Sequence, residues 1–236
     1  MAITNNALTS GLSTTDANSY ATASVTPTAN RLVILCVRNR KAGGGDTPTA
    51  TGNSLTWVQM GTVLSGGGTQ RITFFRAMSA TPTAGAITID FGGVTQTACS
   101  WSVSEFDGVL TTGTDGADAV SQPTVCAAGQ SGLTVVVTLA AFGHVNNGAF
   151  GFFFHPFDEV SVEGSGFTAI HNQSSSENNN NIFTEWRADN DTTVDATWAT
   201  SMGVNEAKAL AVELVAEAAS GNAARSMYYH LVGGVR

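Results

Sequence analysis

Residues 99–106 read Cys-Ser-Trp-Ser-Val-Ser-Glu-Phe, and in them Cys99, Trp101 and Val103 alternate with serines. An alternation of period two places the apolar side chains on one face of a β-strand and the serines on the opposite face. Residues 87–91, Ile-Thr-Ile-Asp-Phe, repeat the pattern. The phase changes at Glu105 and Phe106, which predicts a bulge or the end of the strand there.

Working outward from this stretch, runs rich in Val, Ile, Phe, Trp and Thr recur between short clusters of turn residues. Their ranges are 20–25, 31–38, 55–64, 71–78, 86–91, 97–106, 133–141, 149–155, 168–172, 182–188, 193–200 and 208–215. About a dozen short strands at such spacing are typical of a sandwich or barrel. We therefore predict an all-β fold, an antiparallel two-sheet β-sandwich of jelly-roll type.

The ends of the chain are predicted to lie outside this sandwich. We expect an N-terminal arm over residues 1–16, a sandwich domain over 17–219 and a C-terminal tail over 220–236. Residues 205–219 are rich in helix-forming residues, but Leu210, Val212 and Leu214 alternate. This alternation favours a final strand over a helix.

The charge balance excludes one class of partner. The chain has 10 Lys and Arg against 18 Asp and Glu, a net charge of −8. A nucleic-acid-binding protein needs a basic face that neutralises phosphates, so we expect no nucleic-acid partner. Charged residues make up only 12% of the chain. The surface is therefore largely neutral, which suits close packing against copies of itself or a large partner, although biased amino-acid usage would give the same composition.

The cysteines and the N-terminus bear on the cellular compartment. Cys36, Cys99 and Cys126 are odd in number and lack CxxC spacing, and the first two lie in apolar strand patterns. We expect buried, unpaired thiols. The first residues lack the basic and apolar segments of a secretory signal, and no apolar run approaches the roughly 18 residues of a membrane helix. We expect synthesis in the host cytoplasm and no membrane partner.

Side chains able to do catalysis do not form a recognisable motif. The four histidines include no HxH or HxxxH pair, and there is no GxSxG sequence. A glycosidase of jelly-roll type would need two opposed carboxylates about 5–10 Å apart. The carboxylates available for such a pair are Glu105, Asp107, Asp158, Glu159, Glu163, Glu185 and Glu213. Solvation of strand edges and loops is the favoured explanation for them, and we expect no enzymatic activity.

Two binding hypotheses remain. Asp189, Asp191 and Asp195 supply hard oxygen donors close to the asparagines at 178–181, which makes them candidate calcium ligands. The spacing is not that of an EF-hand, and Asn-rich segments are also ordinary turns. Without this calcium site we expect no cofactor.

The tryptophans are the candidates for stacking on a sugar. They are Trp57, Trp101, Trp186 and Trp198, and all fall in strand patterns. Core packing is therefore the default interpretation for them. Trp186, which lies beside Glu185 and Arg187, is the best candidate for contact with a glycan.

Several segments carry a resemblance. They are residues 25–37 (VTPTANRLVILCV), 51–58 (TGNSLTWV), 77–91 (AMSATPTAGAITIDF), 96–109 (QTACSWSVSEFDGV) and, more loosely, 208–215. These segments resemble a family of β-sandwich proteins encoded among the virion genes of tailed bacteriophages. Because they are strand-and-corner phrases, they indicate fold more than activity. The resemblance implies a phage-type structural protein, either a capsid decoration protein or a tail or fibre component, and it implies no catalytic residue.

Together these observations predict a virion structural protein, with a capsid decoration or cement protein as the leading hypothesis. Its partners would be itself and other virion proteins. The alternatives are a tail-fibre or tail-tip module that binds a cell-surface glycan, and a jelly-roll enzyme acting on glycosides. The expected contact residues are the apolar ones of the two terminal segments, Ile3, Leu8, Leu12, Met227, Tyr228, Tyr229 and Leu231.

Overall fold

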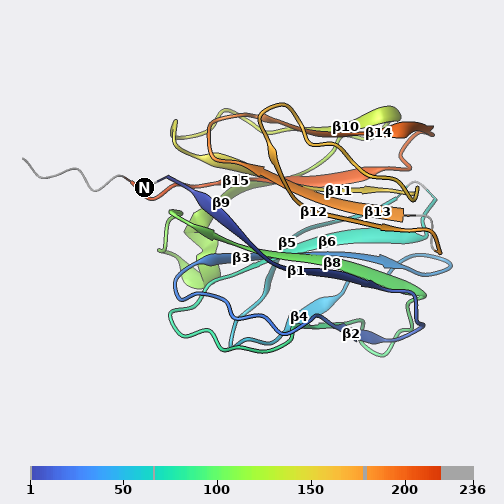
Figure 1. Ribbon diagram of the computed structural model, residues 1–236, viewed down its shortest axis with the longest axis horizontal. Coiled ribbons are helices and arrows are strands. Elements are labelled where there is room, and N and C mark those ends of the chain that lie inside the picture. The colour runs from blue at the N-terminus through green and yellow to red at the C-terminus, as the bar shows by residue number, and fades with distance from the viewer. Residues whose placement is uncertain (1, 66, 178–179, 219–236) are drawn as a thin grey trace, which may run out of the picture.

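The computed structural model describes residues 2–65, 67–177 and 180–218, which form antiparallel sheets stacked in four layers (Figure 1). The predicted all-β, sandwich-like class is confirmed. The number of sheets is four where two were predicted. The jelly-roll connectivity stays a prediction. Within the described residues, no helix has the length and apolar character of a membrane span.

The first half of the chain forms two of the layers. The large sheet has the order β1 (Thr4–Ser13), β8 (Ala98–Asp107), β3 (Leu32–Arg40), β6 (Gln70–Ala77), β5 (Val58–Leu64). The small sheet has the order β2 (Ser19–Ala21), β7 (Thr88–Asp90), β4 (Thr49–Thr51). A short 3-10 segment, η1 (Thr114–Ala119), leads into the second half.

The second half forms the other two layers. Its large sheet has the order β12 (Thr168–Ser175), β13 (Asn180–Arg187), β11 (Gly148–His155), β15 (Lys208–Leu214), β9 (Val120–Val125). Its small sheet pairs β10 (Gly132–Thr138) with β14 (Thr193–Met202). The predicted final strand over 205–219 is thus confirmed as β15.

The two halves repeat one topology. In each, the first strand lies at an edge and pairs with the last strand, β1 with β8 and β9 with β15. The last strand pairs with the central one, β3 or β11, and the sheet then continues through β6 and β5 or through β13 and β12. In the small sheets, β2 corresponds to β10 and β7 corresponds to β14. The pairing of β4 with β7 in unit 1 corresponds in unit 2 to a single bridge between Val162 and Thr197 of β14. The chain is therefore two successive units, unit 1 (β1–β8) and unit 2 (β9–β15).

This arrangement revises the expected domain boundaries. The single sandwich predicted for residues 17–219 is two units. The N-terminal arm predicted for residues 1–16 is instead the edge strand β1, paired with β8 along its length. An edge strand needs few apolar side chains, so the search for apolar strand patterns did not predict a strand in this polar segment. The tail predicted over 220–236 lies outside the described residues.

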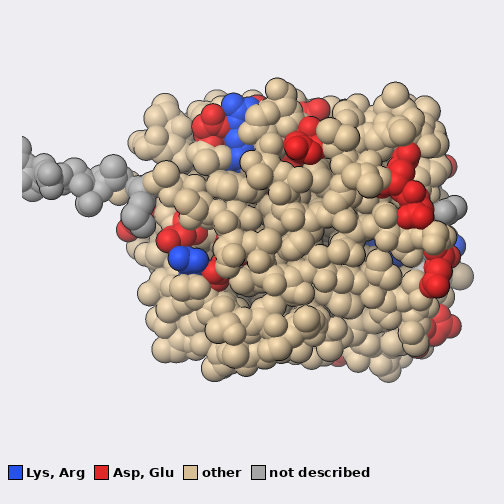
Figure 2. Space-filling model, in the orientation of Figure 1, with Lys and Arg blue, Asp and Glu red and all other residues tan. Residues whose placement is uncertain are grey.

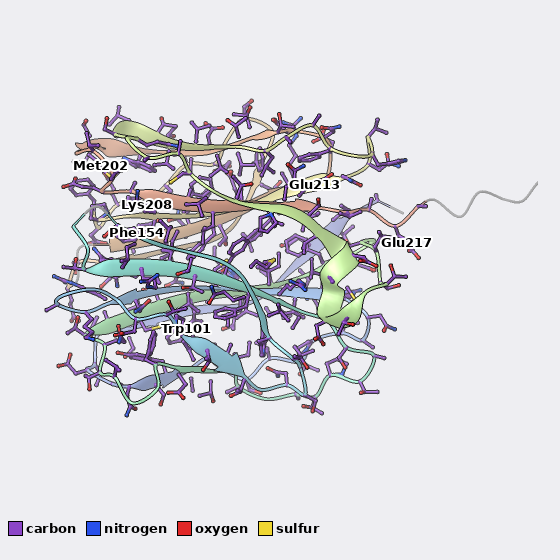
Figure 3. The ribbon with its side chains drawn as sticks, turned by 180° about the vertical axis from the view of Figure 1, so that it is seen from behind. Trp101, Phe154, Met202, Lys208, Glu213 and Glu217 are labelled. Atoms are coloured by element: carbon purple, nitrogen blue, oxygen red, sulfur yellow. The ribbon has the colours of Figure 1, made fainter. Side chains whose placement is uncertain are left out.

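The two large sheets pack face to face, and each small sheet covers the outer face of its own large sheet. Strands β11 and β15 are buried throughout, and β3 is buried in all but its last residue. Strands covered on both faces carry continuous apolar runs. The serine face of β8 is buried too, because unit 2 covers it. The change of pattern predicted at Glu105 and Phe106 lies next to the end of β8 at Asp107, and the strand stays regular up to that residue. Figure 3 shows the layers from behind, with Met202 in the outermost layer of unit 2 and Trp101 below the large sheet of unit 1.

Contacts between the units come in pairs related by exchange of the units, as at a two-fold interface. Strand β1 packs on β12, as β9 packs on β5. Ser102 Oγ lies 2.8 Å from His171 Nδ1. The register of the paired strands makes Leu210 of unit 2 the equivalent of Ser102, and Gly61 of unit 1 the equivalent of His171. These also meet, since a Cβ on Gly61 would lie 3.4 Å from Leu210 Cδ2.

Because Leu210 is fully buried between the units, truncating it should destabilise the whole chain. We expect Leu210→Ala to lower the free energy of unfolding by about 2–5 kcal/mol, measured by chemical denaturation. The control Val204→Ala, at a side chain that is 63% exposed, should change it by less than about 0.5 kcal/mol. Equal effects of the two changes would contradict the face-to-face core.

Candidate functional site

A glutamate in the last strand of unit 1 anchors the loop before β3. Glu105 is 1% exposed and accepts hydrogen bonds from the Thr28 backbone N–H (2.8 Å), Arg31 Nη1 (2.9 Å) and Asn6 Nδ2 (3.1 Å). Burial acts to raise the pKa of Glu105, but these hydrogen bonds outweigh it and hold the pKa below its usual value. Asp107 contributes an ion pair of 3.3 Å to the same Arg31. These carboxylates hold a loop in place.

The equivalent glutamate of unit 2 does the same work. Glu213 in β15 is 3% exposed and accepts hydrogen bonds from Asn147 Nδ2 (2.6 Å), the Gly143 backbone N–H (3.2 Å) and Gln122 Nε2 (2.8 Å). As with Glu105, one donor comes from the first strand of the unit and the others come from the loop before its central strand. Both glutamates, expected as candidate acids, are thus engaged in structural contacts.

Glu185 in β13 is the most perturbed carboxyl. It is fully buried, and Oε2 accepts a hydrogen bond from the Gly164 N–H (2.9 Å), while Oε1 has no hydrogen-bond partner among the described residues. Burial raises the pKa of Glu185 to about 8, and the nearby charges of Asp195 and Glu163 add to the effect. The carboxyl is therefore protonated at neutral pH. With no exposed surface, it offers a substrate no access.

The candidate calcium ligands have another partner. Asp189 and Asp191 both bind the Arg187 guanidinium, Asp191 Oδ2 at 2.6 Å from Nη1. The carboxylate oxygens that a calcium ion would need thus already accept hydrogen bonds, from Arg187 and from the Thr193 N–H. Burial raises the pKa of Asp195, which disfavours the ionised form that a cation would need. In the part of the chain that the structure describes, no three His, Cys, Asp or Glu side chains are grouped to hold a metal ion.

A serine–histidine contact escaped the sequence analysis, because its members are 69 residues apart. Ser102 Oγ lies 2.8 Å from His171 Nδ1 and 3.1 Å from Thr184 Oγ1. A nucleophilic serine needs access to substrate and a third group that orients the histidine. Ser102 is only 2% exposed, and no carboxylate among the described residues hydrogen-bonds to the ring. The contact therefore serves the interface between the units.

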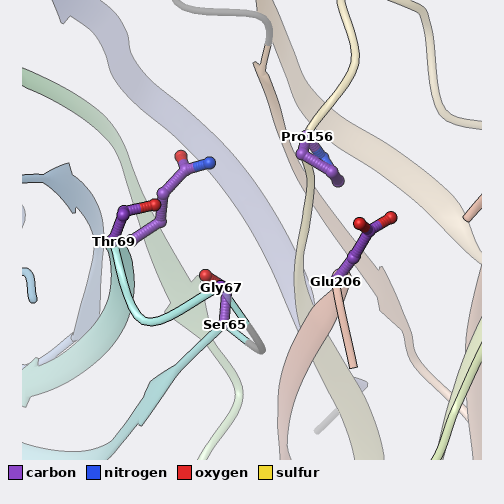
Figure 4. Close-up of a pocket in the computed structure, with 6 residues that line it drawn as sticks. Ser65, Gly67, Thr69, Pro156 and Glu206 are labelled. Atoms are coloured by element: carbon purple, nitrogen blue, oxygen red, sulfur yellow. The ribbon is translucent and has the colours of Figure 1, made fainter. Parts of the chain in front are cut away.

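A small pocket lies at the rim where the units meet (Figure 4). Its volume is about 190 Å³, and it is lined by Ser65, Gly67, Thr69, Gln70, Pro156 and Glu206. Ligand-binding pockets usually measure roughly 300–1,000 Å³ and are lined by apolar and aromatic groups. This pocket is smaller and has no aromatic side chain, so it does not favour a glycan site.

Behind the pocket lies a buried arginine. Arg38 is fully buried, its Nε donates to Gln70 Oε1 (2.7 Å), and its guanidinium lies 5.7 Å from the Phe154 ring centroid. Burial lowers the pKa of Arg38 to about 9. Within the part of the chain that the structure describes, Nη1 of Arg38 has no hydrogen-bond partner. Because Gln70 separates the guanidinium from the pocket, we assign Arg38 to the packing of the units.

The tryptophans do not form an exposed sugar platform. Trp101 and Trp198 are buried. Trp57 and Trp186 are half-buried and pack against the cores, and Trp186 meets Phe106 edge to face with centroids 6.0 Å apart. The default interpretation, core packing, describes all four.

The surface best suited to a partner is the side of the molecule formed by β1 and β12, here called the edge wall. Both strands are the outermost of their sheets, and Gln173 Nε2 of β12 donates a hydrogen bond to Ser10 Oγ of β1 (2.8 Å). Neither strand contains Asp, Glu, Lys, Arg or Pro. Among the described strands, none pairs with their outward edges, and no charge or proline within them opposes pairing with another strand. Figure 2 shows this face, with charged side chains gathered at its margins and a broad uncharged area between them.

The other strand edges of unit 2 are protected. Strand β9 has six residues and includes Pro123, which has no N–H to donate. The outer edge of β10 is capped by Gln130, whose Oε1 accepts from the Val136 N–H (2.6 Å) and whose Nε2 donates to the Val136 carbonyl (2.5 Å). Strand β5, at the other edge of the large sheet of unit 1, is also free of charge and proline, but its neighbour across the interface, β9, is protected. The edge wall is thus the side on which both stacked strands lack charge and proline.

The expected contact residues fall in three places. Ile3 is 2% exposed and belongs to the core between the units, so its assignment to an interface was wrong. Leu8 and Leu12 lie on β1 and are half-buried, within the edge wall. Met227, Tyr228, Tyr229 and Leu231 lie outside the described residues.

Comparison with known proteins gives no assignment. No family model, no curated protein and no solved structure matches the chain. The functional argument therefore depends on the chain's own residues and geometry.

The two anchoring glutamates should matter for stability. We expect Glu105→Gln and Glu213→Gln each to lower the free energy of unfolding by about 1.5–3 kcal/mol, because each weakens hydrogen bonds to a buried charge. Chemical denaturation measures this. The control Asp158→Asn, at an exposed loop position, should have an effect below about 0.5 kcal/mol. A loss at only one of the two glutamates would argue against their equivalence.

Glu185 should make stability depend on pH. Its pKa is about 8 in the folded state against about 4.3 when unfolded, so ionisation favours unfolding between these values. The native protein should lose stability as the pH rises from 5 to 9. We expect Glu185→Gln to remove at least about 2 kcal/mol of this loss while changing little at pH 4. Parallel stability curves for variant and native protein from pH 4 to 9 would show that Glu185 ionises normally.

Proposed function

We propose that this chain is a structural protein of a virion, of the capsid decoration type, acting through contacts between subunits. The observation that carries the proposal is the edge wall, a long side of the molecule with open strand edges and no charge. An exposed edge of this kind favours association with another strand unless it is protected. The resemblance of segments such as residues 25–37 to phage sandwich proteins supports the virion as its location.

The chemistry of the buried groups supports a structural role as well. The carboxylates of Glu105 and Glu213 hold loops, and Glu185 is fully buried. The Ser102–His171 contact lies within the interface between the units. A catalytic role would need at least one of these groups in contact with substrate. The scarcity of charge on the face in Figure 2 suits a subunit packed in a lattice.

Deletion of residues 223–236 tests the assembly role. The last described strand, β15, ends at Leu214, before the deleted segment, so the truncated protein should fold with the same melting temperature. Because the deleted segment carries six apolar side chains larger than alanine, we expect weaker attachment to particles that lack this protein, measured by co-sedimentation. A full-length variant with serine at Met227, Tyr228 and Tyr229 keeps the length and should show the same loss. Full-length protein that ignores the particles would refute the virion role.

A further inference from the structure

We propose that a second copy of this chain docks on the edge wall, with β1 pairing with the partner's β1 and β12 with the partner's β12 across one two-fold axis. This inference deepens the proposed function, since it names one of the subunit contacts on which that function depends.

The geometry allows both pairings at once. A strand pairs antiparallel with its own copy when a two-fold axis stands perpendicular to the sheet. Because the large sheets are stacked and β1 packs directly on β12, one axis can serve both edges. Each five-stranded sheet would then continue into its copy without interruption.

Bulges define which part of each edge pairs. The register of β1 shifts between Ala7 and Thr9, and that of β12 shifts between Ala169 and His171. A bulge disrupts the ladder and bends the strand. The regular stretches are therefore 9–13 in β1 and 171–175 in β12, and the contact of Ser10 with Gln173 lies within both. These stretches are where we expect the two copies to pair.

Charge favours a second copy as the occupant. Across a two-fold axis a strand meets itself, so any charged residue near the axis would face its own like charge. Neither β1 nor β12 contains Asp, Glu, Lys or Arg, although the chain carries a net charge of −8. His171 stays neutral, since burial lowers its pKa. The edge wall can therefore meet its own copy without repulsion.

The internal repeat supplies a control for this argument. Exchange of the units carries β1 and β12 onto β9 and β5 on the opposite side of the molecule. There the counterpart of β1 is only six residues long and contains Pro123, whereas β1 has ten residues and no proline. Two strands in the same topological place thus differ in the features that block strand pairing. The strands β5 and β12 both lack charge and proline, so the two sides differ at β9 and β1.

Paired charge variants test the inference. In the double variant Thr9→Lys with Ser174→Lys, four lysines would meet at the proposed interface. We expect at least about a tenfold rise in the dimer Kd, measured by sedimentation velocity over a range of protein concentrations. The matched control, Thr112→Lys with Ser131→Lys, makes the same residue changes at exposed positions outside the wall and should leave the Kd unchanged. Melting temperatures check that both variants fold.

Hydrogen exchange of the native protein gives a second readout that needs no variant. The amides of residues 9–13 and 171–175 should gain protection as the concentration rises. A protein that stays monomeric at every concentration, or a dimer that the wall lysines do not weaken, would overturn the inference. Particle binding tests the proposed function separately: a dimer that ignores particles keeps this inference, and a monomer that binds particles keeps the proposed function.

Discussion

Strands β3 and β11 are buried on both faces, because the large sheet of each unit is covered by the other unit on one side and by its own small sheet on the other. Burial of this extent leaves no water to satisfy polar groups, so each buried polar side chain needs a partner within the protein. The buried carboxylates of Glu105 and Glu213 find such partners in the loops before β3 and β11, whose Thr28 and Asn147 donate hydrogen bonds to them. Cover on both faces of each large sheet thus explains the apolar runs.

The interface between the units has two chemically different sides. On the side of β1 and β12, Ser102 meets His171 and Thr184. On the side of β5 and β9, the equivalent region brings Leu210 close to Gly61. Apolar contact supplies most of the free energy and is not directional, whereas hydrogen bonds fix relative position. Contacts in equivalent places of the interface therefore differ in chemistry, hydrogen-bonded at Ser102 and His171 and apolar at Leu210 and Gly61.

The strands could be predicted from sequence where their pattern is local. Residues 99–106 and 208–214 lie in β8 and β15, because alternation records which side chains share a face. The pattern does not record what covers each face, so the second pair of layers was not foreseen. The repeat was also hidden, since equivalent positions such as Leu32 and Gly148 share a register without sharing chemistry.

The site was harder to predict than the fold. The contact between Ser102 and His171, and the protection of β10 by Gln130, join residues that only the folded chain brings together. The candidate calcium ligands Asp189 and Asp191 were chosen for their oxygens, but the arginine two and four residues away neutralises them. Local composition shows which donors and acceptors are present, and the three-dimensional arrangement decides which of them pair with each other.

The two units keep the same fold while their edges have diverged, and this difference indicates where the protein meets its surroundings. Packing and the anchoring glutamate act inside each unit, so both copies retain them. An edge strand has no such internal role, and its length and composition can change without loss of the core. In unit 2 the first strand is short and contains Pro123, whereas in unit 1 it is long and uncharged. Since the core constrains neither state, the proposed docking of a second copy on β1 accounts for its open edge.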